Sequence, residues 1–225
     1  MSDTSPALKL DDIYSHGLLA SLLGGNVYLP FTSSSMRPYC LVHILNDVLL
    51  NRRARILEFG SGVSTRLLGR LIRKNQLGAR VTSVEHDPAW AKLLADGLRQ
   101  DDTNEHVEVL TAPLTGCALA KDDNLWYDVG VLDRALRGRT FDLVIVDGPP
   151  AWEPGRERAR YPALPYIRSQ LAKSFSFYLD DSEREGERMI SDEWASELGA
   201  RFIIAGSTLA CCRVGEFFNS EPVKG

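Results

Sequence analysis

The chain has 225 residues, of which 44% are hydrophobic and 25% are charged, and this composition is typical of one sizeable α/β domain with its own core. The formal net charge of −4 and the pI near 5.6 provide no broad cationic field, so nucleic acid is not expected as the main partner. The sequence contains no apolar run long enough to span a membrane and no basic-then-apolar start typical of a signal peptide. We therefore expect a cytoplasmic protein.

Four cysteines occur, and none of them has the C-x-x-C spacing of a redox or metal motif. Cys211 and Cys212 are adjacent in an apolar run, and we expect both to be small core residues. Free thiols are compatible with a reducing compartment.

Residues 1–53 are expected to form a helical cap and substrate lid. Helices are predicted over 12–23 and 39–50, with a turn at Gly24-Gly25-Asn26 after the first. The loop between them carries aromatic, hydroxyl and basic side chains and is expected to cover the substrate. His43 is expected to be a packed or surface residue and not a catalyst. The apolar positions are Ile13, Leu18, Leu19, Leu22 and Leu23 in the first helix, and Leu41, Ile44, Leu45 and Val48 in the second.

The stretch 55–65, Arg-Ile-Leu-Glu-Phe-Gly-Ser-Gly-Val-Ser-Thr, predicts a cofactor site. Its apolar residues form a buried strand, and Gly60 and Gly62 allow a sharp turn with a ligand against bare backbone before a helix begins. A dinucleotide fingerprint would place a third glycine where Thr65 stands, which weakens an NAD hypothesis. Glu58 can accept hydrogen bonds from an ammonium group, which favours an amino-acid-bearing nucleotide. A tight turn without any ligand is the alternative.

The next two strands place further residues at the same edge of the predicted sheet. Glu85 ends the second strand, 23 positions after Gly62, where an acid would bind ribose hydroxyls. The alternative is that Glu85 caps the helix that follows it. His86 would flank the nucleotide, and a third strand at 107–114 should bring Ala112 near an adenine ring.

A central strand is predicted over 141–147, because a β-branched apolar run is typical of a parallel strand buried on both faces. It ends in Asp147, which should lie at the carboxyl edge of the sheet, where open α/β sheets bind ligands. The loop at 151–160 contains three arginines, the last of them Arg160. It is compatible with a lid for an anionic substrate or with a solvated loop.

The rest of the chain is predicted to complete the sheet with a reversed hairpin. The last two strands, at 201–206 and 209–214, are joined by so short a link that they must be antiparallel. Trp126 and Tyr127 would form an aromatic pair beside the pocket. Trp126 is expected to pack against the helix that follows, and stacking of the pair on a ligand is the alternative. The other predicted elements are a loop at 121–128, helices at 163–172 and 184–198, the second with Met189, Ile190, Trp194 and Leu198 inward, and a strand at 173–181 that ends in Asp180-Asp181.

This layout resembles the class I S-adenosylmethionine (SAM) methyltransferases. Their motif, acid-x-Gly-x-Gly-x-Gly, appears as Glu58, Gly60, Gly62 and, departing from it, Ser64. The resemblance implies a Rossmann-like, seven-stranded α/β sheet with a C-terminal antiparallel hairpin strand, and a SAM-binding domain over 54–225 that forms one compact unit with the cap. The hydroxyls after the glycines would bind the cofactor's carboxylate or cap the helix. The implied SAM contacts are Glu58, Gly60, Ser61, Gly62, Ser64, Thr65, Glu85, His86, Ala112 and Asp147.

Within that family, the spacing of the acids is similar to that of small-molecule O-methyltransferases of the catechol and caffeoyl-CoA type. The resemblance implies that Asp147, Asp180 and Asp181 hold Mg²⁺, a hard ion that prefers oxygen ligands, and that Asp147 is catalytic. Two positions depart from the family. Asp181 occupies the position where the family has asparagine, and Pro150 occupies the position of the lysine that serves the family as general base. Metal-independent action, with the acid pair capping the next helix, is the alternative.

The implied function is SAM-dependent transfer of a methyl group to a hydroxyl of a small molecule or glycan, with catalysis arising mainly from alignment and desolvation. A homodimer is a further expectation. An aminopropyltransferase, which uses decarboxylated SAM, and a non-catalytic SAM- or nucleotide-binding module are the alternatives. A base N-methyltransferase is disfavoured, because Gly148 and Ala151 break the Asp/Asn-Pro-Pro-aromatic motif of such enzymes.

Overall fold

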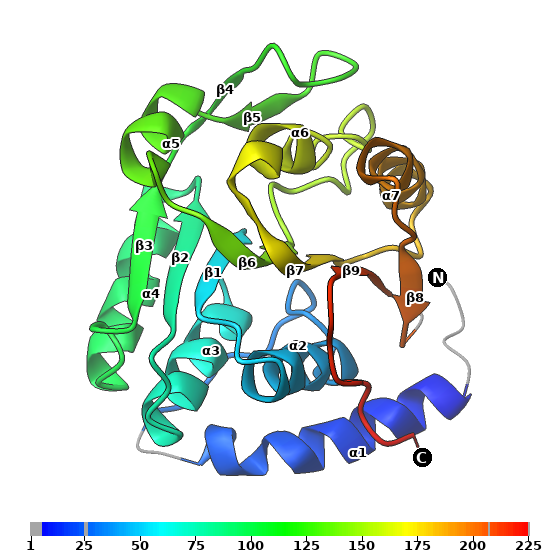
Figure 1. Ribbon diagram of the computed structural model, residues 1–225. Coiled ribbons are helices and arrows are strands. Elements are labelled where there is room, and N and C mark those ends of the chain that lie inside the picture. Colours follow the sequence, from blue (N-terminus) through cyan, green and yellow to red (C-terminus); the bar gives the residue numbers. More distant parts are fainter. Residues whose placement is uncertain (1–5, 25–26, 207, 225) are drawn as a thin grey trace.

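A computed structural model describes residues 6–24, 27–206 and 208–224, and its centre is a seven-stranded sheet with helices on both faces (Figure 1). The strand order is β3-β2-β1-β6-β7-β9-β8. Strand β9 is antiparallel to both of its neighbours, and the other adjacent pairs are parallel. The expected fold class is confirmed. The strands are β1 Arg55–Phe59, β2 Arg80–Glu85, β3 Val107–Thr111, β6 Phe141–Val146, β7 Leu171–Leu179, β8 Ile203–Ala205 and β9 Leu209–Val214.

Helices cover the two faces of the sheet in two layers, each with its own apolar cluster. In Figure 1, α1 is the outermost element below the sheet and runs past α2 and α3, whereas α5, α6 and α7 lie above it. One layer consists of α1 Pro6–Leu23, α2 Pro38–Leu50, α3 Val63–Lys74 and α4 Pro88–Gln100. The other consists of α5 Val129–Leu136, α6 Ala163–Ile167 and α7 Glu185–Leu198.

The central strands are buried because both faces of the sheet are covered. All six residues of β6 are buried, and so are the last four residues of β1. Near-continuous apolar runs of this kind are the pattern of a parallel sheet between two helical layers. The same pattern allowed both strands to be predicted from the sequence.

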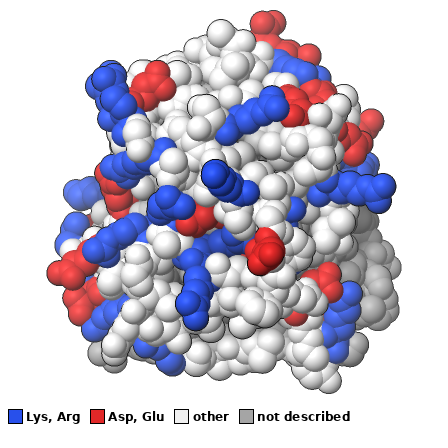
Figure 2. Space-filling model, in the orientation of Figure 1, with Lys and Arg blue, Asp and Glu red and all other residues white. Residues whose placement is uncertain are grey.

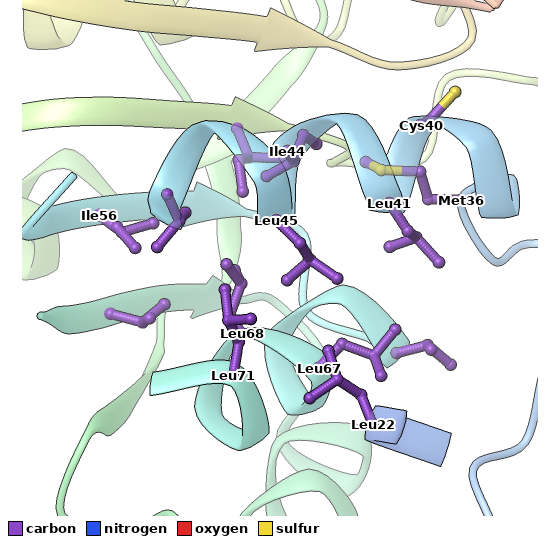
Figure 3. Packing of buried hydrophobic residues seen from close by; sticks show 14 of the residues in the cluster. Leu22, Met36, Cys40, Leu41, Ile44, Leu45, Ile56, Leu67, Leu68 and Leu71 are labelled. Atoms are coloured by element: carbon purple, nitrogen blue, oxygen red, sulfur yellow. The ribbon is translucent and has the colours of Figure 1, made fainter. Parts of the chain in front are cut away.

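The N-terminal helices share the main core. Figure 3 shows Leu41 and Leu45 of α2 directed toward Leu67 and Leu68 of α3, and all four side chains are buried. The predicted apolar stripe of α2 is therefore confirmed. Because the cap and the sheet share one apolar cluster, the two segments pack as one unit, and the boundary at residues 53 and 54 stays a prediction.

Three predicted elements differ in the structure. The expected strand at 107–114 is broken into β3 and β4 Leu114–Gly116, because Pro113 has no N–H to continue a ladder. Strand β4 pairs with β5 Leu125–Tyr127 in a separate hairpin, where a loop was expected. The expected helix at 163–172 is shorter: α6 is followed by a 3₁₀ turn over Arg168–Gln170 and then by β7.

Three predicted core positions are wrong. Ile13 is 68% exposed, and Leu18 is also exposed, whereas Leu19 and Leu22 of the same helix are buried. Helix α1 is the outermost helix and therefore buries only a narrow stripe of its apolar side chains. Met189 of α7 is exposed too. The expected turn at 25–26 and the central residue of the hairpin link, 207, lie outside the described residues.

The surface carries both signs of charge. On the face seen in Figure 2, basic and acidic side chains are intermingled. Arg139, for example, is paired with Glu108 at 2.7 Å between exposed side chains. Over the ranges that the structure describes, no helix has the length and apolar character needed to cross a membrane.

A buried polar group lies between α2 and the sheet. Asp47 accepts a hydrogen bond from the Tyr178 hydroxyl at 2.6 Å and pairs with Arg53 at 3.2 Å. His43 is fully buried, contacts the Arg213 guanidinium and packs edge-on against the Tyr178 ring. Burial, with the nearby positive charge of Arg213, lowers the pKa of His43 to about 4. His43 is thus a packed histidine, as the sequence predicted.

We predict that His43 makes the protein less stable at acidic pH. Between about pH 6.5 and 4 the unfolded chain binds a proton that folded His43 does not, so the free energy of unfolding falls as the pH falls. The loss is on the order of 3 kcal/mol across this window. His43→Gln should flatten the pH dependence measured by urea denaturation, whereas His16→Gln, at an exposed histidine, should not. Equal slopes for the wild type and His43→Gln would contradict the assignment.

Candidate functional site

A cavity of about 670 Å³ opens at the carboxyl ends of β1, β2, β6 and β7. Open α/β sheets bind ligands at this edge, where neighbouring connections run to opposite faces. The cavity lies between the N-terminal layer and the loop after β6. Its walls include Thr32, Ser33, Ser34 and Ser35, the glycine turn from Gly60 to Ser64, Glu85, His86, Trp90, Tyr127, Asp147, Trp152, Arg160, Asp180, Asp181 and Arg184.

The two glycines of the turn serve different purposes. A Cβ on Gly60, whose φ is +93°, would lie 2.7 Å from the backbone carbon of Asp147 and 2.7 Å from the nitrogen of Gly148. Gly60 is therefore required by the close approach of two chain segments. A Cβ on Gly62 would have no described atom within 4 Å, although Gly62 lines the cavity. The open space beside Gly62 is available to a ligand.

Glu58 lies behind the cavity and not on its wall. Its carboxylate accepts hydrogen bonds from the hydroxyls of Ser64 at 2.6 Å, Thr65 at 2.5 Å and Ser83 at 2.6 Å. Burial raises the pKa of Glu58, and these hydrogen bonds oppose that rise. Glu58 thereby ties β1 to β2 and to the start of α3, and contact with an ammonium group stays a prediction. Ser64 also reaches the cavity wall, whereas Thr65 does not.

Glu85 presents one carboxylate oxygen to the cavity. Its Oε1 accepts hydrogen bonds from the backbone N–H groups of His86 and Asp87, both at 2.8 Å. Its Oε2 accepts only a longer bond, from Ser61 N at 3.3 Å, and so retains capacity for a hydroxyl donor. The hydrogen bond between Glu85 and the imidazole raises the pKa of His86. Ala112 is buried and does not line the cavity, so its contact with adenine stays a prediction.

The wall contains several aromatic residues, of which Tyr127 was predicted as part of an aromatic pair beside the pocket, whereas Trp90 and Trp152 were not found by sequence reasoning. The Tyr127 hydroxyl is buried and has no hydrogen-bond partner among the described residues. Trp90 donates from its indole N–H to the carbonyl of Ser61 at 2.9 Å, and Trp152, 63% exposed, lies at the rim. Trp126 is fully buried against Phe59, as predicted. The hydroxyl of Tyr127 lies close to Gly148, where a Cβ would come within 2.5 Å of it, and it lacks the partner that a buried hydroxyl usually has.

The three acids expected to bind metal do meet at the cavity, but they surround an arginine. The guanidinium of Arg160 lies 3.0 Å from Asp181 Oδ2 and 3.4 Å from Asp147 Oδ1. Burial and the neighbouring Asp180 raise the pKa of Asp147 well above its usual range. Burial and the adjacent Asp181 raise the pKa of Asp180 to about 7. The loop at 151–160 is thus not simply solvated, because its last arginine is buried in the site.

The expected Mg²⁺ site is not supported. No three His, Cys, Asp or Glu residues in the described part of the chain are arranged to hold a metal ion. Hard cations need several oxygens directed at one point, whereas the cavity-facing carboxylates of Asp147 and Asp181 are directed at Arg160. The residues present therefore do not fit a divalent cation.

The fold and the position of the cavity define an α/β domain with a ligand site at the carboxyl edge of its sheet. Residues 57–182, more than half of the chain, match the family model described as "Methyltransferase domain". The chain belongs to this methyltransferase family. A comparison with curated proteins found no match.

Solved structures of methyltransferases are similar to this chain over most of its length. An O-methyltransferase from Bacillus cereus in complex with SAH has 18% identity and a TM-score of 0.56, with 96% of this chain and 93% of that chain covered. A candidate caffeoyl-CoA O-methyltransferase from Staphylococcus aureus has 15% identity and a TM-score of 0.58, with 92% and 98% covered. A methyltransferase-like protein from Silicibacter pomeroyi has 24% identity and a TM-score of 0.52, with 83% and 89% covered. At these identities the likeness establishes the shared fold.

We predict that adding a methyl group destabilises the protein much more at Gly60 than at Gly62. Gly60→Ala should lower the free energy of unfolding by at least about 2 kcal/mol, because the new Cβ meets backbone atoms at a left-handed φ. Gly62→Ala should lower it by no more than about 1 kcal/mol, the cost of alanine at a helix N-cap. Thermal denaturation of both variants checks this contrast, and equal losses would contradict the distinct roles of the two glycines.

Proposed function

We propose that this chain is a SAM-dependent methyltransferase that transfers a methyl group to a hydroxyl of a small molecule or glycan. The observation that carries the proposal is the Oε2 of Glu85, whose one bond from the described residues is the longer one from Ser61 N, in a cavity that Gly62 also lines at the carboxyl edge of the sheet. The family membership and the SAH-bound structure of similar fold support it.

The cofactor would lie along the glycine turn. Glu85 would accept hydrogen bonds from the ribose hydroxyls, and the backbone at Gly62 leaves room for close approach. Tyr127 lines the same cavity, and its buried hydroxyl, which lacks a described partner, would donate to a polar group of the ligand. When bound, SAM supplies an activated methyl group, so the protein's task is to align the acceptor and exclude water.

The acceptor would occupy the part of the cavity beneath the N-terminal loop. That loop contributes residues Thr32 through Ser35 to the cavity wall, to which Trp152 and Arg184 also contribute. Such polar groups around an aromatic side chain fit a hydroxylated acceptor. Asp147, which also lines the cavity, would accept the proton that the hydroxyl loses, as a general base.

We predict that SAM and SAH bind to the wild type and that Glu85→Ala weakens binding about 10- to 100-fold, the value of hydrogen bonds to a charged group. Glu85→Gln, which keeps the volume and one acceptor oxygen, should give an intermediate affinity. Glu108→Ala removes an exposed acid from the neighbouring strand and should bind as the wild type does. Isothermal titration calorimetry, with thermal denaturation as a folding check, measures these affinities. No binding of SAM by the folded wild type would refute the proposal.

Turnover separates methyl transfer from related functions. A panel of phenols, sugars and other hydroxyl compounds, incubated with SAM and examined by mass spectrometry, should give a methylated product and SAH. Aminopropylation with decarboxylated SAM would instead identify an aminopropyltransferase. Tight SAM binding without any product across the panel would favour a non-catalytic binding module.

A further inference from the structure

Four carboxyl groups converge where β6, β7 and α7 meet, in the part of the cavity that the resemblance to O-methyltransferases assigns to Mg²⁺. Asp147 follows β6, Asp180 and Asp181 follow β7, and Glu187 lies in the first turn of α7. All four side chains are buried or largely buried. Carboxylates in such surroundings require a partner charge, because an unpaired buried charge is costly.

Arg160 supplies that charge from inside the cluster. Its side chain is only 3% exposed. Its Nη2 lies 3.0 Å from Asp181 Oδ2 and 3.4 Å from Asp147 Oδ1, and its Nη1 lies 3.7 Å from Glu187 Oε1. Because an arginine side chain keeps its proton in proteins, this positive charge is permanent.

The remaining hydrogen bonds of Arg160 fix it to the ends of the two strands. Its Nε donates to the carbonyl of Pro149 at 3.2 Å, its Nη1 to the carbonyl of Asp180 at 3.2 Å, and its Nη2 to the carbonyl of Asp147 at 3.1 Å. A guanidinium with donors directed both at backbone and at carboxylates has little freedom to leave. The guanidinium therefore forms part of the wall and is not a mobile lid residue.

A second arginine reinforces this arrangement. Arg184 Nη1 lies 2.8 Å from the same Asp181 Oδ2 that pairs with Arg160. One carboxylate oxygen thus lies within ion-pair distance of two guanidinium groups. A divalent cation at this point would meet two like charges at close range, which is unfavourable in a partly buried site.

We propose that the Arg160 guanidinium takes the place of the divalent cation, holding the carboxylates of Asp147 and Asp181 in position, so that the chain transfers methyl groups without a metal ion. The positioning role rests on the proposed methyl transfer. The exclusion of a divalent cation rests only on the ion pairs that Arg160 makes with the carboxylates, and it can be tested without a methyl-group acceptor.

Manganese titration followed by electron paramagnetic resonance tests the exclusion directly. The wild type should bind no Mn²⁺ at this site. Arg160→Gln removes the charge at similar volume and should create a site for about one Mn²⁺ per chain, because Asp147 then has no ion partner among the described residues and Asp181 and Glu187 share only Arg184. Arg160→Lys keeps a positive charge and should bind none. Adding Asp181→Asn to Arg160→Gln should abolish the new site.

Arg158→Gln is the matched control, because Arg158 lies in the same loop but pairs with Glu193; it should bind no Mn²⁺. Binding of Mn²⁺ by the wild type that is lost in Asp181→Asn would overturn the proposal, and this comparison does not require Arg160→Gln to fold. A folded Arg160→Gln that binds no Mn²⁺ would overturn it as well.

Kinetics test the positioning role. Wild-type turnover should be unchanged by EDTA or by added Mg²⁺. Arg160→Gln should lower kcat at least about tenfold with SAM affinity retained, and Arg160→Lys should recover part of the loss, since a misplaced catalytic group slows the chemical step. Equal kcat in all three proteins would overturn this role. If no acceptor is methylated at all, the proposed function fails, while the manganese titration still decides whether Arg160 excludes a cation.

Discussion

The site depends on the close contact between the end of β1 and the end of β6. Phe59 and Val146 are register partners, the N–H of Asp147 donates to the carbonyl of Phe59 at 2.8 Å, and Gly60 then passes so near Asp147 that a Cβ cannot be accommodated. The chain has to turn away from the sheet here, and this turn brings the start of α3 to the carboxyl edge. Since β2 lies on one side of β1 and β6 on the other, the connections diverge and leave a crevice for a ligand.

Buried charges then fix the strand ends around that crevice. Glu58 is held by three hydroxyls from two elements, and Arg160 is held by carboxylates and carbonyls from the ends of β6 and β7. A buried charge tolerates few alternative arrangements, because each lost partner leaves an uncompensated group in a medium of low dielectric. The hydroxyls around Glu58 therefore fix the ends of β1 and β2, and the ion cluster around Arg160 fixes the ends of β6 and β7.

The sequence predicted those parts of the fold that have a local pattern. Each of these patterns lies within about ten residues of sequence and was located correctly: the apolar runs of β1 and β6, the glycine turn, and the acid at Glu85. The strand β5 was missed because a run of three residues is too short to show an alternation of apolar and polar side chains. The exposure of Ile13 was missed because tertiary packing decides which part of an apolar helix face is covered. The place of Arg160 could not be predicted, since its partners are brought together only when β6, β7 and α7 assemble.

A crystal structure of the protein grown with SAH and Mn²⁺ would test the central claim most directly. We expect SAH along the turn from Gly60 to Gly62, with its ribose hydroxyls on Glu85. We also expect Arg160 between Asp147 and Asp181, with no anomalous manganese peak there. A manganese ion bound by those two carboxylates with Arg160 displaced, or SAH bound away from Glu85, would contradict these assignments.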